Sequence, residues 1–213
     1  MKITADRLGK RFNREWIFRN LSFTFEPGCY AVVGPNGSGK STLLQVLWGQ
    51  IPPSEGKLTF ATDDGREIAP EQIHTFLSIA TPYMELIEEF TLSEMIAFHF
   101  RFKKARDGWS SDQILDYMEL RRASGKYISE FSSGMRQRLK LGLAMLSASP
   151  LLFLDEPTTN LDQKSTDWYL ETLKNIPSAT TVLIASNQAH EYPAAAKKID
   201  ISTFKQVTTR PEL

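Results

Sequence analysis

The chain has little cysteine, little histidine and no surplus of charge of either sign. Cys29 is the only cysteine among 213 residues, so an intrachain disulfide is impossible, and three histidines give no Cys/His zinc site. Lys+Arg and Asp+Glu both number 25, so the basic excess expected of a nucleic-acid binder or a polybasic membrane-surface protein is missing. We therefore expect no nucleic-acid partner.

Long hydrophobic runs are also missing. No uninterrupted apolar stretch approaches the ~20 residues of a membrane span. The first residues, MKITADR, contain no apolar segment of a signal peptide. We expect a soluble protein of a reducing compartment with one large α/β domain, which another protein would have to hold at any membrane where it acts.

Strand and helix patterns alternate along most of the chain, which predicts a mainly parallel sheet covered by helices, with an antiparallel N-terminal part. Strands are expected at 3–8, 21–25, 30–33, 76–80, 151–154, 180–185 and 199–203, a hairpin turn at 63–65, and helices at 42–48, from 133, and at 162–175.

A helical insertion interrupts this alternation. Thr91 and Glu94 have the spacing of a capping box for a helix that ends near Phe102, and Ser111 opens a second helix predicted to run through Leu120. The aromatic-rich first helix is expected to form the core of the insertion, or alternatively to line a groove for a partner helix. We divide the single domain into a core at 1–82 and 131–204, a helical subdomain at 83–130 and a tail at 205–213.

Residues 34–41, GPNGSGKS, match the phosphate-binding loop of nucleotide-binding proteins, between a buried strand and a helix. Its glycines let several backbone N–H groups point inward, and the helix N-terminus adds partial positive charge. Lys40 supplies a full charge to the terminal phosphates, and the Ser41 hydroxyl can ligate Mg²⁺. We assign nucleotide contacts to Gly34, Asn36, Gly37, Ser38, Gly39, Lys40, Ser41 and Thr42.

Two carboxylates follow the apolar run 151–154. Asp155 and Glu156 are expected at the carboxyl end of a buried strand, where open α/β sheets bind ligands. Asp155 can hold Mg²⁺, through a water, and Glu156 can polarise an attacking water.

The segment 131–139, FSSGMRQRL, resembles the signature motif of ATP-binding-cassette (ABC) ATPases in a Ser-Ser-Gly-Met variant. The order of loop, helical insertion, signature and Asp-Glu strand resembles that family over residues ~1–204. The resemblance implies a P-loop fold and a site in which Ser132, Ser133 and Gly134 complete the nucleotide site of a second copy or a homologous cassette. Ser132 is also a good helix N-cap, so a plain helix start is the other interpretation.

Two further segments resemble family motifs. Phe12 follows Lys10-Arg11 where the family places an aromatic that stacks on adenine, with a buried core phenylalanine as the rival interpretation. The segment 159–162 resembles the D-loop, which crosses the dimer interface. Asp162 would then face the partner cassette, or would only cap the following helix.

Two positions depart from the family pattern. Pro82 stands where a glutamine is usual, so water, Thr81 or Tyr83 must fill its place. Asn187 stands where a histidine usually touches the γ-phosphate, and an amide can donate a hydrogen bond but never as a cation. His190 is a weaker substitute.

The resemblance implies the ATP-binding subunit of an ABC transporter that uses ATP and Mg²⁺, with Lys40, Glu156 and Asn187 as its catalytic residues. It would work on the inner face of the cell membrane through a separate transmembrane permease subunit, and the variant signature favours export. We expect slow ATP hydrolysis. The alternatives are an ATP-binding regulatory module with little hydrolysis and a soluble ABC ATPase outside transport.

Overall fold

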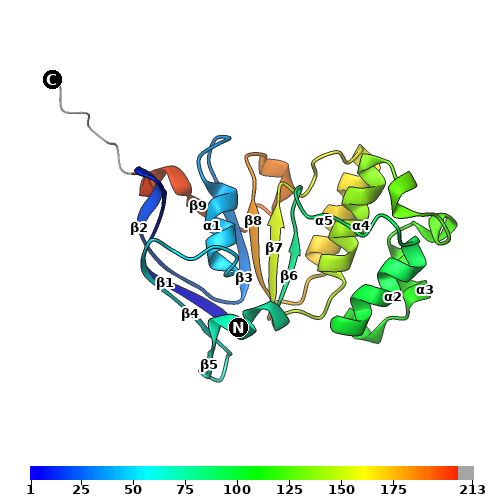
Figure 1. Ribbon diagram of the computed structural model, residues 1–213, viewed down its shortest axis with the longest axis horizontal. Coiled ribbons are helices and arrows are strands. Elements are labelled where there is room, and N and C mark those ends of the chain that lie inside the picture. The colour runs from blue at the N-terminus through cyan, green and yellow to red at the C-terminus, as the bar shows by residue number, and fades with distance from the viewer. Residues whose placement is uncertain (206–213) are drawn as a thin grey trace.

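An antiparallel sheet forms the N-terminal end of the protein in the computed structural model, which describes residues 1–205. Its strands are β1 (Lys2–Phe12), β2 (Glu15–Phe25), β4 (Glu55–Ala61) and β5 (Glu67–Ile68), in the order β2-β1-β4-β5. The hairpin turn predicted at 63–65 joins β4 to β5, with Gly65 at φ 86° and its N–H bonded to the Thr62 carbonyl at 2.9 Å. Figure 1 shows this sheet at one end of the molecule.

A five-stranded parallel sheet lies beside it. Its strands are β3 (Gly28–Val33), β6 (Leu77–Ala80), β7 (Leu151–Asp155), β8 (Thr181–Ala185) and β9 (Lys197–Asp200), in the order β6-β7-β8-β3-β9. Every residue of β7 and β8 is buried, as continuous apolar runs predict for strands covered on both faces. The predicted fold class is confirmed. Because β7, β8 and β3 are parallel neighbours, their carboxyl ends meet at one edge.

Three helices cover this sheet. They are α1 (Lys40–Leu47), α4 (Ser133–Met145) and α5 (Gln163–Lys174). Trp48, at the end of α1, packs edge-on against Phe153 of β7 with ring centroids 5.5 Å apart. Because α1 follows β3, α5 follows β7 and α4 leads into β7, these helices begin at the edge where the strands end, and their N-termini gather around it (Figure 1).

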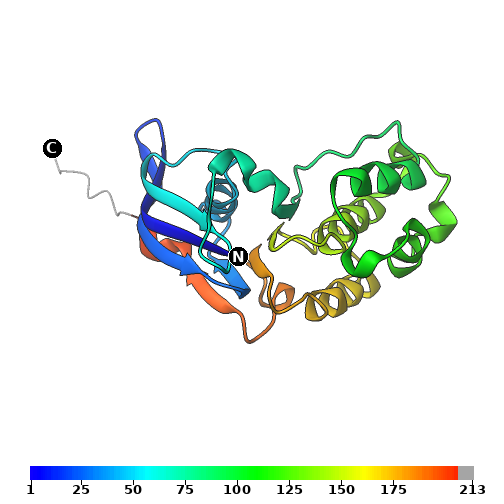
Figure 2. The same ribbon diagram turned by 90° about the horizontal axis from the view of Figure 1, so that it is seen from below.

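The helical segment lies at the opposite end of the molecule from the antiparallel sheet (Figure 2). The capping box of Thr91 and Glu94 begins α2 (Leu92–Phe102), and a second one, of Ser110 and Gln113, begins α3 (Ser111–Tyr117). The prediction that this second helix reaches Leu120 is wrong: it ends at Tyr117, and Glu119 has a left-handed backbone at φ 55°.

Only one side of α2 belongs to the core of this segment. Met95 and Ile96 are buried, but Phe98 is 38% and Phe102 is 74% exposed. The expectation that the aromatic side chains of this helix form core is therefore wrong for these two, which instead pack on each other at 5.2 Å between ring centroids.

Short 3₁₀ turns complete the chain: Pro70–Thr75, Arg106–Gly108, Arg121–Ala123, Ile128–Glu130, Ala189–Glu191 and Ile201–Phe204. The last corrects the strand predicted at 199–203, because β9 begins earlier and stops at Asp200, whose side chain accepts a bond from the Ser202 N–H at 2.9 Å. Of the predicted tail, residues 206–213 lie outside the described residues. No helix in residues 1–205 is long and apolar enough to cross a membrane.

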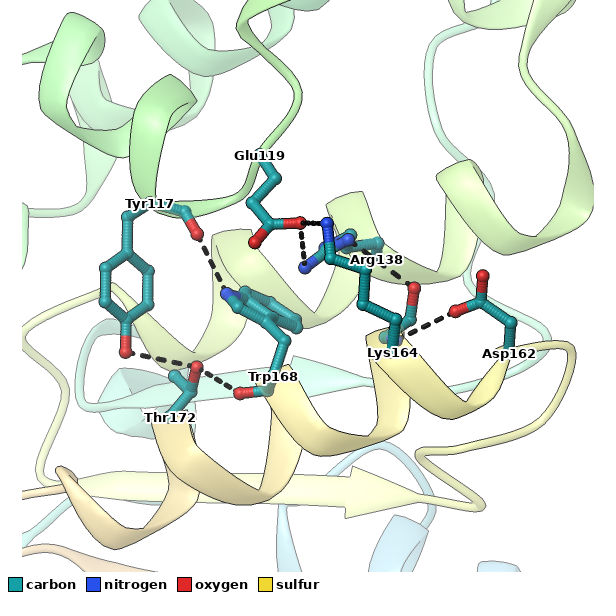
Figure 3. A network of polar contacts seen from close by, with 8 residues as sticks. Tyr117, Glu119, Arg138, Asp162, Lys164, Trp168 and Thr172 are labelled. Atoms are coloured by element: carbon teal, nitrogen blue, oxygen red, sulfur yellow. Dashed lines mark hydrogen bonds and ion pairs between the residues drawn. The ribbon is translucent and has the colours of Figure 1, made fainter.

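A polar network fastens the helical segment to α4 and α5 (Figure 3). The Trp168 Nε1–H donates to the Tyr117 carbonyl at 2.9 Å. The Glu119 carboxylate pairs with Lys164 at 2.7 Å and with Arg138 at 3.3 Å. Glu119 has a left-handed backbone and lies just after the end of α3, so its two ion pairs form at the point where that helix stops.

Candidate nucleotide site

The loop 34–41 connects β3 to α1 at the carboxyl edge of the parallel sheet. Gly34, Gly37 and Gly39 all have positive φ, at 147°, 73° and 103°. A Cβ on Gly39 would lie 2.3 Å from a methyl of Ile17, so only glycine fits at the N-cap of α1. The three glycines therefore have backbone conformations that other residues rarely adopt, and the loop leads directly into α1.

The Lys40 side chain lies across this loop. Its ammonium group donates to the carbonyls of Gly34 at 3.0 Å and Pro35 at 3.1 Å, and the residue is only 5% exposed. A buried cation whose hydrogen bonds within the described residues go to neutral carbonyls still attracts an anion strongly. Lys40 is thus in place to meet phosphate oxygens.

Asp155 ends β7 and is 2% exposed. Within residues 1–205 its Oδ1 atom and the Ser38 hydroxyl are buried without a hydrogen-bond partner. Burial raises the pKa of Asp155 to about 6, with the charges of Glu156 and Glu191 adding to the rise and Ser41 and Lys40 opposing it. Buried polar atoms that lack partners are places where water, an ion or a ligand binds.

These atoms suit Mg²⁺ bound together with phosphate. No group of three or more His, Cys, Asp or Glu side chains in the described residues could hold a metal alone. Mg²⁺ commonly uses one or two protein oxygens and takes its remaining ligands from phosphate and water. Ser41 and Asp155 fit that pattern, with the phosphates as the missing ligands.

Glu156 follows directly and has an unusual backbone. Its φ is 44°, in the left-handed region that non-glycine residues rarely adopt, and its N–H bonds the Ala185 carbonyl of β8 at 2.9 Å. Strain of this kind persists where surrounding structure imposes it and is common at functional sites. The residue as a whole is half-buried.

Asn187 follows β8 and contacts the phosphate loop. Its Nδ2 donates to the Asn36 Oδ1 at 2.8 Å, and both residues are exposed. His190, the weaker substitute, is also exposed, with its Nε2 3.5 Å from the Thr158 hydroxyl. The position after β8 is therefore joined to the loop after β3 by an amide–amide hydrogen bond.

The segment 132–134 begins α4. The Ser132 hydroxyl accepts from the Met135 N–H at 3.2 Å, which is the plain capping interpretation, and both Ser132 and Ser133 are exposed. A Cβ on Gly134 would lie 3.1 Å from the Asn160 carbonyl. The helix start therefore faces outward while its glycine packs closely against the segment 159–162.

Asp162 caps α5, since its Oδ1 accepts from the Ser165 N–H at 2.8 Å. Its side chain is exposed. The capping interpretation holds for the single chain.

Phe12 ends β1 and is 48% exposed, which contradicts the buried-core interpretation. The Lys10 ammonium lies 5.1 Å from its ring centroid. An exposed ring of this kind can stack on a flat ligand.

Pro82 lines a groove. The Lys140 ammonium donates to its carbonyl at 2.8 Å, and Tyr83 next to it is 83% exposed. The groove has a volume of about 740 Å³ and is lined by Pro82, Tyr83, Met84, Glu85, Leu86, Glu88, Arg136 and Lys140.

Two buried side chains that the sequence pattern does not mark as functional hold the segment after Glu156. Gln137 of α4 donates from Nε2 to the Pro157 carbonyl at 2.9 Å, and Glu191 accepts the Thr158 N–H at 2.9 Å. Gln137 and Glu191 lie on helical turns, where the pattern predicts that a polar side chain is exposed to solvent. Only the packing of the fold shows that they are buried.

Comparison with known proteins agrees with this geometry. Residues 18–159 match the family model described as ABC transporter. The chain is 30% identical to the Nod factor export ATP-binding protein I of Rhizobium johnstonii, over 86% of this chain and 60% of that protein. It is 28% identical to the zinc import ATP-binding protein of Roseobacter denitrificans, over 92% of this chain and 73% of that protein.

The fold also matches solved structures. The dimeric structure of a bacterial ABC transporter cassette superposes with a TM-score of 0.72 at 22% identity, over 87% of this chain and 88% of that chain. The chain spans between 60% and 65% of the length of several curated relatives, which are therefore longer proteins. On the family match over residues 18–159, the chain belongs to the ABC transporter family of ATP-binding cassettes.

Proposed function

We propose that this protein binds and hydrolyses ATP as the nucleotide-binding subunit of an ABC transporter. The observation that carries the proposal is a pair of atoms that are buried without a hydrogen-bond partner in residues 1–205, Asp155 Oδ1 and Ser38 Oγ, together with the buried ammonium of Lys40. Together they offer a negative oxygen for a cation, a hydroxyl for an oxygen and a charge for phosphate, which is the chemistry of a nucleoside triphosphate with its metal.

Each residue near this pair has a chemical role in the proposal. Lys40 and the inward N–H groups of 34–41 bind the β- and γ-phosphates, and Phe12 stacks on the adenine. Ser41 and Asp155 would hold Mg²⁺, which neutralises charge on the phosphates when bound. Glu156 orients and deprotonates the attacking water, and Asn187 donates a hydrogen bond to the γ-phosphate.

The proposal also assigns a role to the exposed start of α4. Ser132, Ser133 and Gly134 present a helix N-terminus to solvent, which attracts anions. In a symmetric dimer this N-terminus closes on the γ-phosphate held by the other copy, with Asp162 at the interface. Two copies, or one copy and a homologous cassette, thus make two composite sites.

A transport role rests on the relatives. One relative is named for export and another for import. The similarity therefore supports a transport role more strongly than it supports either direction of transport. We propose export through a separate transmembrane subunit, in keeping with the Ser-Ser-Gly-Met signature. That subunit would hold this protein at the inner face of the cell membrane. Cargo would be chosen by that subunit.

Phosphate release tests hydrolysis. The full chain with Mg-ATP should release phosphate slowly, and the Glu156→Gln variant should fall to background while still binding ATP. Equal background rates in both proteins would contradict the proposal.

A second function is favoured by Pro82 and Asn187. Without the glutamine oxygen and the histidine cation usual in the family, the chain would serve as a regulatory module that binds ATP and dimerises. Equal background phosphate release by the wild type and Glu156→Gln, with ATP binding retained in both, would favour this second function.

A further inference from the structure

Glu191 is a buried carboxylate to which the proposed function gives no role. It is 1% exposed and ends the turn Ala189–Glu191, four residues after Asn187. One oxygen accepts from the Thr158 N–H at 2.9 Å and from the Thr158 hydroxyl, and the other accepts from the Ser186 hydroxyl. Burial of a carboxylate is unfavourable unless it is bonded in this way.

The partners of Glu191 adjoin two proposed catalytic residues. Thr158 lies two residues after Glu156, and Ser186 directly precedes Asn187. The ladder between β7 and β8 ends with Asp155 opposite Ala185, and the Glu156 N–H makes the last backbone bond between the two segments. Beyond that point the Glu191 carboxylate bonds both segments, and the Thr158 hydroxyl also lies 3.5 Å from the His190 Nε2.

Glu191 is itself held in place. Its carbonyl accepts from the hydroxyl of Tyr169, a fully buried residue of α5, at 2.7 Å, and its N–H bonds the Gln188 carbonyl at 3.1 Å. The carboxylate therefore cannot shift without leaving its donors unbonded inside the protein, which is costly.

We propose that Glu191 is a positioning residue for ATP hydrolysis: its buried carboxylate fixes the segment carrying Glu156 relative to the segment carrying Asn187, so that both face the γ-phosphate in one arrangement. This inference rests on the proposed function. It predicts an effect on the chemical step rather than on nucleotide binding, because the hydrogen bonds that Glu191 makes in residues 1–205 do not go to the phosphate loop 34–41.

Steady-state kinetics of Glu191→Ala and Glu191→Gln test the inference. Alanine removes both acceptors, so kcat should fall about tenfold or more while KM for ATP changes less than about twofold. Glutamine keeps an oxygen for Thr158 and offers an N–H₂ group to the Ser186 hydroxyl, so kcat should stay within about threefold of the wild type. If only the negative charge of Glu191 mattered, Glu191→Gln would lower kcat as Glu191→Ala does.

Thr158→Val and Thr181→Val form a matched pair in case Glu191→Ala folds poorly. Both residues are buried, and each substitution removes one hydroxyl group. The Thr158 hydroxyl also lies 3.5 Å from the His190 Nε2. Thr158 bonds Glu191, whereas Thr181, at the opposite end of β8, bonds the Met1 carbonyl at 2.7 Å. Thr158→Val should lower kcat about threefold or more, and Thr181→Val should leave it unchanged at a similar loss of melting temperature.

The outcomes separate this inference from the proposed function. Wild-type phosphate release equal to that of Glu156→Gln would overturn the proposed function and this inference with it. An active wild type whose kcat is unchanged in Glu191→Ala, or equally lowered by Thr158→Val and Thr181→Val, would overturn the role of Glu191 alone.

Discussion

The side-chain amide of Asn187 donates a hydrogen bond to the side-chain oxygen of Asn36, 2.8 Å away, and so joins the end of β8 to the phosphate loop. The two residues are 151 positions apart in sequence. Because both are exposed, incoming phosphate can compete for the Asn187 donor. The bond thus holds the amide close to the position proposed for the γ-phosphate.

Replacement of Asn187 tests whether this amide limits the rate. A neutral hydrogen bond is worth ~0.5–1.5 kcal/mol and a charged one ~1.5–3 kcal/mol. Asn187→His should therefore raise kcat up to about tenfold below pH 6.5, where imidazole is protonated, and Asn187→Ala should lower it. Initial rates of phosphate release measure both, and a histidine variant no faster than the wild type would show that the amide does not limit hydrolysis.

Lys40 should govern ATP affinity. Loss of its charge removes charge-assisted bonds to two phosphates, so Lys40→Ala should weaken Mg-ATP binding about a hundredfold or more. Titration calorimetry measures the change, with Lys57→Ala, an exposed lysine of β4, as the matched control. Comparable affinities for the two variants would remove Lys40 from the site.

Asp155 gives the site a pH dependence. Its pKa is raised to about 6, chiefly by burial, and only its ionised form can hold Mg²⁺. Mg-ATP affinity should therefore fall between pH 7.5 and 5.5. The phosphates of ATP also take up protons in this range, so the comparison is with Asp155→Asn, which should bind weakly and with a smaller pH dependence. Equal pH slopes for both proteins would refute the role of Asp155.

His99 should make the fold sensitive to acid. Its Nε2 lies 2.9 Å from the Ser147 hydroxyl, which donates to the Leu143 carbonyl, so His99 is the donor. Burial, with the Lys103 charge, lowers its pKa from 6.5 to about 4. Between these values the unfolded chain binds a proton that the folded chain does not, so stability is lost as pH falls.

The expected loss from this one group is ~2 kcal/mol at pH 4.5. Glutamine can donate to Ser147 and does not titrate, so His99→Gln should lose correspondingly less unfolding free energy than the wild type between pH 7.5 and 4.5. Denaturant titrations at both pH values measure this, and identical losses would contradict it.

The sequence predicted most of the parallel sheet because its strands are continuous apolar runs, and it predicted the phosphate loop because glycine and lysine spacing there has one geometric meaning. It missed the left-handed turn at Glu119, since that backbone is stabilised by ion pairs to Arg138 and Lys164 from other elements. Local pattern cannot show such partners.

Two other outcomes have the same cause. Phe98 and Phe102 have the periodicity of core residues, but nothing in the pattern shows which face of α2 stays exposed in residues 1–205. The role inferred for Glu191 depends on Thr158, 33 residues away, so only the fold brings the carboxylate to its donors.

The central claim is that two copies share each triphosphate, with 34–41 of one facing 132–134 of the other. Light scattering of the Glu156→Gln variant with Mg-ATP tests it most directly. We predict a mass about twice the 24.2 kDa of the single chain, and a return to the single mass without nucleotide or with a bulky Ser132→Arg substitution. A single-chain mass at saturating Mg-ATP, or a dimer indifferent to Ser132→Arg, would contradict the account.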